Sequence, residues 1–200
     1  MLSNELNLKK LFSKIGLLYF LGIPISVFNS IFLARVISVE DFGKYGFIIS
    51  LSSVFSIFIS GGIPLFLIRE IAGNKSPSGV INRTFKNIIL KNIFLIIIFF
   101  VICRIFNVGS INNFIIISTI IIFSSLNAFF SGILKGFKKP FLSDLIIQVF
   151  HPLIFSITLI SIYYFGYFEL SNVIRGYITT LFLILIFNYI LYKYFNNSRQ

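Results

Sequence analysis

The sequence is poor in charged residues and especially poor in acidic ones. Only 12% of its 200 residues are Asp, Glu, Lys or Arg, and only six are acidic. A soluble domain keeps about a quarter of its residues charged. The chain is instead 57% hydrophobic, with a mean hydropathy of +0.97. A surface this apolar suits a lipid bilayer and excludes an ordinary soluble domain.

The residues that build metal sites and catalytic centres are equally scarce. Cys103 is the only cysteine and His151 the only histidine, which excludes a disulfide scaffold and a zinc cluster. The acidic residues all fall in loops or near the ends of apolar segments: Glu5, Glu40, Asp41, Glu70, Asp144 and Glu169. Membrane-embedded hydrolases and metalloenzymes need clustered carboxylate, His or Cys side chains. We therefore expect no enzymatic activity, no metal, no cofactor and no carboxylate inside a span.

We expect neither a linker nor a cleavable leader in this sequence. No Gly/Ser-rich or Pro-rich stretch and no long charge run divides it, which favours one compact bundle. Lys9, Lys10 and Lys14 precede the apolar run from Ile15, as basic residues do in signal peptides. This run is longer than a usual signal, however, and no small-residue cleavage site follows it. We expect a retained first helix.

Six apolar segments are long enough to cross a membrane as helices. They run approximately from Ile15 to Val36, Tyr45 to Ile68, Ile88 to Phe106, Ile111 to Leu134, Phe141 to Phe165 and Asn172 to Tyr192. Strands of β-barrels are too short for such runs, and the short polar connections favour antiparallel neighbours. The prediction is all-α: a polytopic transmembrane bundle of about six helices over residues 15–192, with cytoplasmic segments at 1–14 and 193–200.

The basic residues fall mainly on one side of this bundle. Thirteen of the 17 lie before the first span, around the second and fourth connections and in the tail, against Arg35, Lys44, Arg104 and Arg175 on the other side. Lys and Arg concentrate in cytoplasmic loops, so both termini are predicted to be cytoplasmic. The same rule accounts for the net charge of +11 without a nucleic-acid partner.

Glycine and proline are expected to interrupt three of the spans. The candidate hinges are Gly22 and Pro24 in span one, Gly61, Gly62 and Pro64 at the end of span two, and Pro152 in span five. Each proline lacks an N–H and frees the carbonyl four residues earlier, which must find a partner in the membrane. Plain kinks are common in transmembrane helices. Three breaks in six helices nevertheless favour a protein that lines a cavity and moves.

Several polar residues fall inside the predicted spans. Asn29, Asn127 and Asn188 are expected to face the interior and form hydrogen bonds between helices. Gln148 and His151 are three residues apart, so a shared helix face is predicted. Their position beside Pro152 makes them candidates for a polar cavity wall. A proton relay through His151 is the less favoured reading, because no carboxylate lies at a suitable spacing.

Three local patterns resemble a known family. The first is Leu33-Ala34-Arg35-Val36-Ile37 followed by Glu40-Asp41-Phe42-Gly43-Lys44-Tyr45-Gly46, the second is Gly61-Gly62-Ile63-Pro64 followed by Ile68-Arg69-Glu70-Ile71-Ala72, and the third is Gly132-Ile133-Leu134-Lys135-Gly136-Phe137-Lys138-Lys139. In this order they resemble the amino-terminal half of bacterial polysaccharide flippases. These are the O-antigen and capsule transporters of the multidrug/oligosaccharidyl-lipid/polysaccharide exporter superfamily, which includes the MATE-like exporters.

The resemblance implies a fold and a transport activity. Such flippases have two bundles of about six helices around a central cavity. They move undecaprenyl-pyrophosphate-linked oligosaccharides from the cytoplasmic leaflet of the inner membrane to the outer leaflet. The implied cationic cavity makes the following residues candidates for substrate binding: Arg35, Arg69, Lys91 and Lys135, with Gln148 and His151 from the helix break, and more weakly Lys44, Arg104 and Arg175. For each basic residue, anchoring at the membrane surface is the alternative.

Six spans correspond to one lobe of such a transporter. The expected partners are the lipid-linked oligosaccharide, membrane lipids, and a second six-helix half or a second copy of the chain. Two other functions stay open. One is a truncated or structural membrane protein without transport of its own. The other is a small-molecule exporter of the same superfamily, which the lack of intramembrane carboxylates disfavours.

Overall fold

The structure is a computed structural model that describes residues 2–73, 77–105 and 111–197, with side chains for 13–73, 77–101 and 114–197. Its helices are α1 (Leu2–Val36), α2 (Val39–Ser60), α3 (Ile63–Gly73), α4 (Ser78–Ile105), α5 (Ile111–Gly136), α6 (Pro140–Leu145), the π-helix η1 (Ile146–Phe150), α7 (His151–Tyr164) and α8 (Leu170–Asn197). These ranges contain no strand. The side chains of Cys103 and Arg104 lie outside the described residues, as do Lys75 and Phe106.

Six helical segments are long and apolar enough to cross a membrane. They are Ser13–Val36, Val39–Gly73, Ser78–Val101, Phe114–Gly136, Pro140–Tyr164 and Leu170–Asn197. Large apolar side chains are exposed along them, such as Phe20 at 77% and Phe58 at 71%. Lipid is the surrounding that such a surface requires. The predicted all-α bundle of six spanning helices is confirmed.

Two helices begin earlier than hydropathy alone indicates. Helix α2 begins at Val39, not near Tyr45, because the Ser38 hydroxyl accepts the Asp41 N–H at 3.1 Å and caps the helix. Helix α4 begins at Ser78, so Lys91 lies on a helix and not beside a connection. Hydropathy marks the apolar part of a helix, whereas polar turns extend beyond it.

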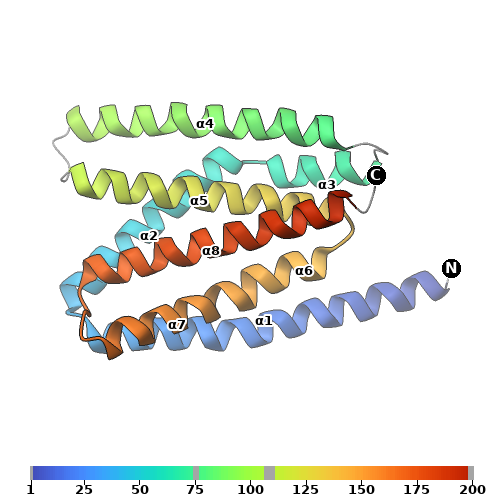
Figure 1. The fold of residues 1–200 in the computed structure, drawn as a ribbon. Helices are drawn as coiled ribbons and strands as arrows, with labels where there is room; N and C mark the ends of the chain where they lie inside the picture. The colour runs from blue at the N-terminus through green and yellow to red at the C-terminus, as the bar shows by residue number, and fades with distance from the viewer. Residues whose placement is uncertain (1, 74–76, 106–110, 198–200) are drawn as a thin grey trace.

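Helix α5 occupies the centre of the bundle. It packs most extensively against α2, α3 and α8, and α4 lies along its outer side. Helix α1 packs along α6, η1 and α7 and meets α2 at only a few positions. Figure 1 shows α4 and α1 on opposite sides of the bundle, with the start of α1 and the end of α8 at the same end.

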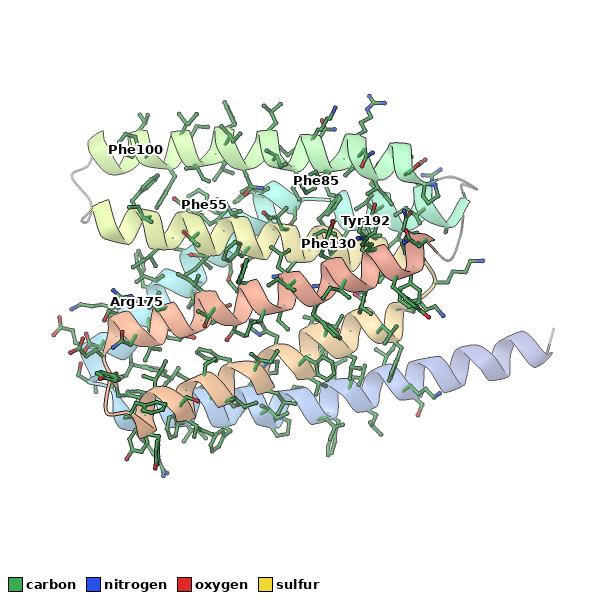
Figure 2. All side chains as sticks on the ribbon, viewed as in Figure 1. Phe55, Phe85, Phe100, Phe130, Arg175 and Tyr192 are labelled. Atoms are coloured by element: carbon green, nitrogen blue, oxygen red, sulfur yellow. The ribbon has the colours of Figure 1, made fainter. Side chains whose placement is uncertain are left out.

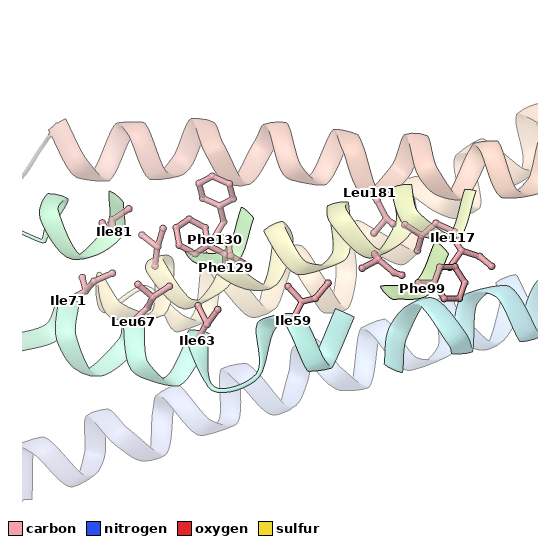
Figure 3. Close-up of a cluster of buried hydrophobic side chains, with 14 of the residues drawn as sticks. Ile59, Ile63, Leu67, Ile71, Ile81, Phe99, Ile117, Phe129, Phe130 and Leu181 are labelled. Carbon is pink, nitrogen blue, oxygen red and sulfur yellow. The ribbon is translucent and has the colours of Figure 1, made fainter. Parts of the chain in front are cut away.

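A large apolar cluster holds α2, α3, α4, α5 and α8 together. Ile59, Ile63 and Leu67 contribute from one side, and Phe129 and Leu181 from the other (Figure 3). A second cluster joins α1, α7 and α8 through Leu33, Ile37, Phe155, Leu159 and Val173. The first helix is therefore held mainly by the fifth span, which α6, η1 and α7 form.

The break in the second span falls where the sequence predicts it. Helix α2 ends at Ser60, and α3 begins at Ile63 after a turn in which Gly62 has a φ of +74°. A side chain would be strained in this conformation. Pro64 is the second residue of α3, where the missing N–H costs no helical hydrogen bond.

Two glycines of α5 allow α3 to pack unusually close. A Cβ added at Gly132 would lie 2.7 Å from the Pro64 Cα, and one at Gly136 would lie 2.8 Å from the Ile71 Cβ. Small residues four positions apart let transmembrane helices approach closely. This contact fixes the short helix after the break onto the central helix.

Candidate functional site

The fifth span contains a π-helical turn, the one π-helix in the described part of the chain. It consists of α6, the π-helix η1 and α7, and η1 ends immediately before His151 and Pro152. The N–H of His151 donates to the Ile146 carbonyl, five residues earlier. π-Helical turns are rare and often occur at functional sites. The backbone stays helical through Pro152, and its irregularity is the π-helical turn that precedes this residue.

Helix α1 covers this irregular segment through Gly22. Pro152 has no N–H to offer the Gln148 carbonyl. A Cβ built at Gly22 would clash with the oxygen of that carbonyl and lie 2.9 Å from its carbon. The carbonyl therefore faces the glycine Cα, in the arrangement of a weak Cα–H···O contact. Glycine is the one residue type that permits this approach.

The first span itself is not interrupted. Pro24 lies inside α1, which is helical from Leu2 to Val36, so the break predicted at Gly22 and Pro24 is wrong. A transmembrane helix can absorb a proline when neighbouring groups adjust. The irregular backbone is found in the helix that faces Gly22, not in α1.

Asn29 of α1 forms hydrogen bonds with α7 just after the π-helix. Its amide donates to the Pro152 carbonyl at 2.9 Å, and the Ser156 hydroxyl donates to its Oδ1 at 2.6 Å. The Asn29 side chain is only 5% exposed.

A second set of hydrogen bonds joins α5 to α8: Asn127 donates to the Leu181 carbonyl at 3.1 Å and accepts from Asn188 at 3.0 Å. The predicted interhelical role of these asparagines is confirmed.

His151 and Gln148 face different neighbours. The imidazole of His151 contacts the Tyr177 ring of α8 edge-on, at 5.7 Å between centroids. The Gln148 Cβ lies 3.4 Å from a Cβ built at Gly22 of α1. These contacts are with two different helices, and the residue spacing in a π-helix differs from that in an α-helix. Within the described residues, His151 has no hydrogen bond or ion pair that would form a relay.

The candidate cations Arg35, Arg69 and Lys91 are exposed on three different helices. Arg35 lies in the last turn of α1, Arg69 on α3 and Lys91 on α4. None of the three belongs to an ion pair among the described residues. The structure does not bring them together within this chain. Lys44 differs, since it pairs with Glu40 at 2.8 Å.

Lys135 is already engaged by an acidic residue. Its Nζ lies 2.8 Å from Oδ1 of Asp144, with side chains 31% and 11% exposed. Beside this pair, the hydroxyls of Ser131 and Ser143 lie 2.8 Å apart. Asp144 is the fifth residue of the segment Pro140–Tyr164, near its end, as the sequence predicts. Lys135, on the other side of the turn, supplies the positive charge that offsets the cost of burying the Asp144 carboxylate.

Breaking this pair is expected to destabilise the bundle. Asp144→Ala leaves the Lys135 ammonium half-buried without a counter-charge and should cost about 1.5–3 kcal/mol. Thermal unfolding in detergent, followed by circular dichroism, measures the loss. Lys135→Gln in the same background should recover part of it. Glu40→Ala is the control, since its pair with Lys44 is exposed. Equal losses in the two alanine variants would contradict a role for burial.

Two grooves are open on the surface of the described residues. One, of about 520 Å³, lies between α4, α5 and α8 beside Phe85, Phe130 and Tyr192. The other, of about 470 Å³, lies between α7 and α8 beside Arg175. Arg175 and Tyr192, which line the two grooves, lie toward opposite ends of α8 (Figure 2). None of the principal substrate candidates lines either groove. Among the described residues, no group of three or more His, Cys, Asp or Glu could hold a metal.

Comparison with known proteins gives one match. The sequence matches the family described as "Polysaccharide biosynthesis protein" over residues 8–200. No curated protein and no solved structure gives a significant match. The family and the six apolar helices indicate a multi-pass membrane protein of transporter type, involved in polysaccharide export. The chain belongs to the polysaccharide biosynthesis protein family.

Proposed function

We propose that the chain is one lobe of a flippase. It would carry undecaprenyl-pyrophosphate-linked oligosaccharide units from the cytoplasmic to the outer leaflet of the bacterial cytoplasmic membrane. The observation that carries the proposal is the match over residues 8–200 to a polysaccharide biosynthesis family, on a chain with six helices of spanning length. A second six-helix half, or a second copy, would supply the opposite wall of the cavity.

The packing of α1 supports alternating access. Helix α1 rests on the broken fifth span and barely touches α2. The second span is divided at Gly61 and Gly62, and the fifth contains η1 before Pro152. Breaks of this kind concentrate changes in backbone angles during domain motion. Bending at these two places would open the space between spans one, two and five first to one side and then to the other.

Exposed cations support the choice of substrate. Arg35, Arg69 and Lys91 have no counter-charge among the described residues, so their donors are available to a pyrophosphate. Lys135 is a weaker candidate for binding the pyrophosphate because its ammonium already forms an ion pair with Asp144. We place both termini in the cytoplasm, because Lys138 and Lys139 lie in the turn after α5, at the end of the bundle where α1 begins and α8 ends (Figure 1).

The test is complementation of a flippase-deficient strain. The chain is expressed alone and with a second six-helix half, and surface polysaccharide is measured at equal protein level. Arg35→Ala, Arg69→Ala and Lys91→Ala should each lower polysaccharide by about tenfold, as expected for the loss of one charge-assisted contact. Lys86→Ala, another exposed cation of α4, is the control and should have no effect.

The outcomes separate the competing functions. Undiminished polysaccharide in all three variants would reject the assigned roles. Restoration only in the presence of a second half would support a lobe. Absence of restoration in both backgrounds, with the protein inserted and abundant, would favour a structural protein without transport.

A further inference from the structure

The groove between α7 and α8 combines a polar end with an apolar wall. It is lined by Ile157, Thr158, Ser161, Ile162, Phe165, Tyr167, Asn172, Arg175, Gly176 and Thr179, and it encloses about 470 Å³. Gly176 packs closely against another lining residue: a Cβ there would lie 2.9 Å from Cδ1 of Ile162. A side chain at position 176 would therefore displace Ile162 within the lining of the groove.

Arg175 is the strongest hydrogen-bond donor in this groove. Its guanidinium donates to Oδ1 of Asn172 at a long distance of 3.4 Å and has no ion pair among the described residues. A guanidinium carries five N–H donors, so most of them remain available. Asn172 itself is fixed, since its amide donates to the Tyr167 carbonyl at 2.9 Å.

Three of the hydroxyls that line the groove cannot compete with Arg175 as donors. Thr158, Ser161 and Thr179 each donate to a backbone carbonyl of their own helix, at 2.8 Å in every case. Each hydroxyl has a single proton, so these three can only accept further bonds. The groove thus presents one positive charge, a combination that suits an anion such as a phosphate.

The position of the groove favours a phosphate that belongs to a membrane lipid. Arg175 is the sixth residue of α8, so it lies within about 9 Å of the end of the helix, at the depth of lipid headgroups. Exposed Tyr163, Tyr164 and Tyr167 surround this end, as aromatic residues do at a membrane surface. Ile157, 63% exposed, continues the lining of the groove along α7 toward the hydrocarbon.

We propose that this groove binds one anionic membrane phospholipid. Its phosphate would contact Arg175, and one acyl chain would lie along Ile157 and Ile162 between α7 and α8. A soluble phosphate would leave the apolar wall uncovered, whereas a phospholipid covers both parts. Occupation of this groove by a lipid does not depend on the proposed function.

A single introduced tryptophan can report lipid binding in the groove by its fluorescence. The sequence contains no Trp, so Phe165→Trp places a single tryptophan in the groove. The full chain is reconstituted in nanodiscs of phosphatidylcholine, with increasing fractions of phosphatidylglycerol brominated on its acyl chains. Brominated phosphatidylcholine serves as the zwitterionic comparison. Quenching of the tryptophan measures how often a brominated chain occupies the groove.

We expect half-maximal quenching at a fraction of phosphatidylglycerol about fivefold lower than that of brominated phosphatidylcholine. Arg175→Ala should abolish this preference, and Arg175→Lys should keep part of it. Arg83→Ala, an exposed arginine of α4 outside the groove, is the matched control and should change nothing. Helical content and a monodisperse profile in size-exclusion chromatography confirm that each variant is folded.

Three results would overturn the proposal. One is equal quenching by the two lipids in the parent protein. Another is an unchanged preference in Arg175→Ala. The third is relief of quenching by excess inorganic phosphate, which would identify a soluble anion as the ligand.

Discussion

Replacing Gly22 by valine is expected to separate α1 from the broken fifth span and to abolish transport. The new Cβ would clash with the Gln148 carbonyl, which is backbone and cannot move aside as a side-chain end could. Overpacking typically costs 1–3 kcal/mol, and we expect the upper end here, about 3 kcal/mol. Thermal unfolding in detergent measures the stability, and complementation measures the transport.

The same helix provides the control for this experiment. A Cβ at Gly16 meets nothing within 4 Å, so Gly16→Val makes the same chemical change in an open position. It should leave both the unfolding midpoint and the surface polysaccharide close to the parent values. If Gly22→Val behaved like Gly16→Val, the close contact of α1 with η1 would not exist in the membrane.

The second large effect is expected at Gly132 in the central helix. Gly132→Val would drive its side chain into the Pro64 backbone and push α3 away from α5, at a cost of about 2–3 kcal/mol. Gly136→Ala should cost less, because it adds a single methyl group, which would lie 2.8 Å from the Ile71 Cβ and 3.1 Å from the Leu67 carbonyl oxygen. Thermal unfolding of the two variants in detergent shows which substitution lowers the stability of the bundle more.

Gly46→Val in α2 is the control for this series, since a Cβ there meets nothing within 4 Å. Equal stability of Gly132→Val and Gly46→Val would show that α3 is not held against α5. A loss in Gly136→Ala larger than that in Gly132→Val would also be inconsistent with the packing described. It would place the tighter contact at Ile71 instead of Pro64.

The sequence predicts the number and type of helices because the signals are strong and local. Long apolar runs define the spans, and the pair Gly61 and Gly62 marks the turn before α3. The family resemblance could be predicted because it rests on three short sequence motifs, and the family match over residues 8–200 agrees with it. The interhelical role of Asn29 was also predictable, because a polar side chain in lipid must find a partner.

Features that depend on tertiary contacts escape this reasoning. The π-helix before Pro152 separates Gln148 from His151, and no local pattern distinguishes it from an α-helix. The burial of Asp144 depends on Lys135, which lies across a turn. One available signal was overlooked in the sequence: Gly132 and Gly136, four residues apart, have the spacing that permits close packing of helices in membranes.

The tie between Asn29 and α7 has a consequence for biogenesis. Its two partners, Pro152 and Ser156, lie 123 and 127 residues later in the chain. At a synthesis rate of about 5–20 residues per second, the first helix would wait roughly 6–25 s for them after entering the membrane. During this time its amide has no native partner and α2 offers it little contact. Proteins that shield nascent helices in the bilayer should therefore matter most for this chain before its fifth span emerges from the ribosome.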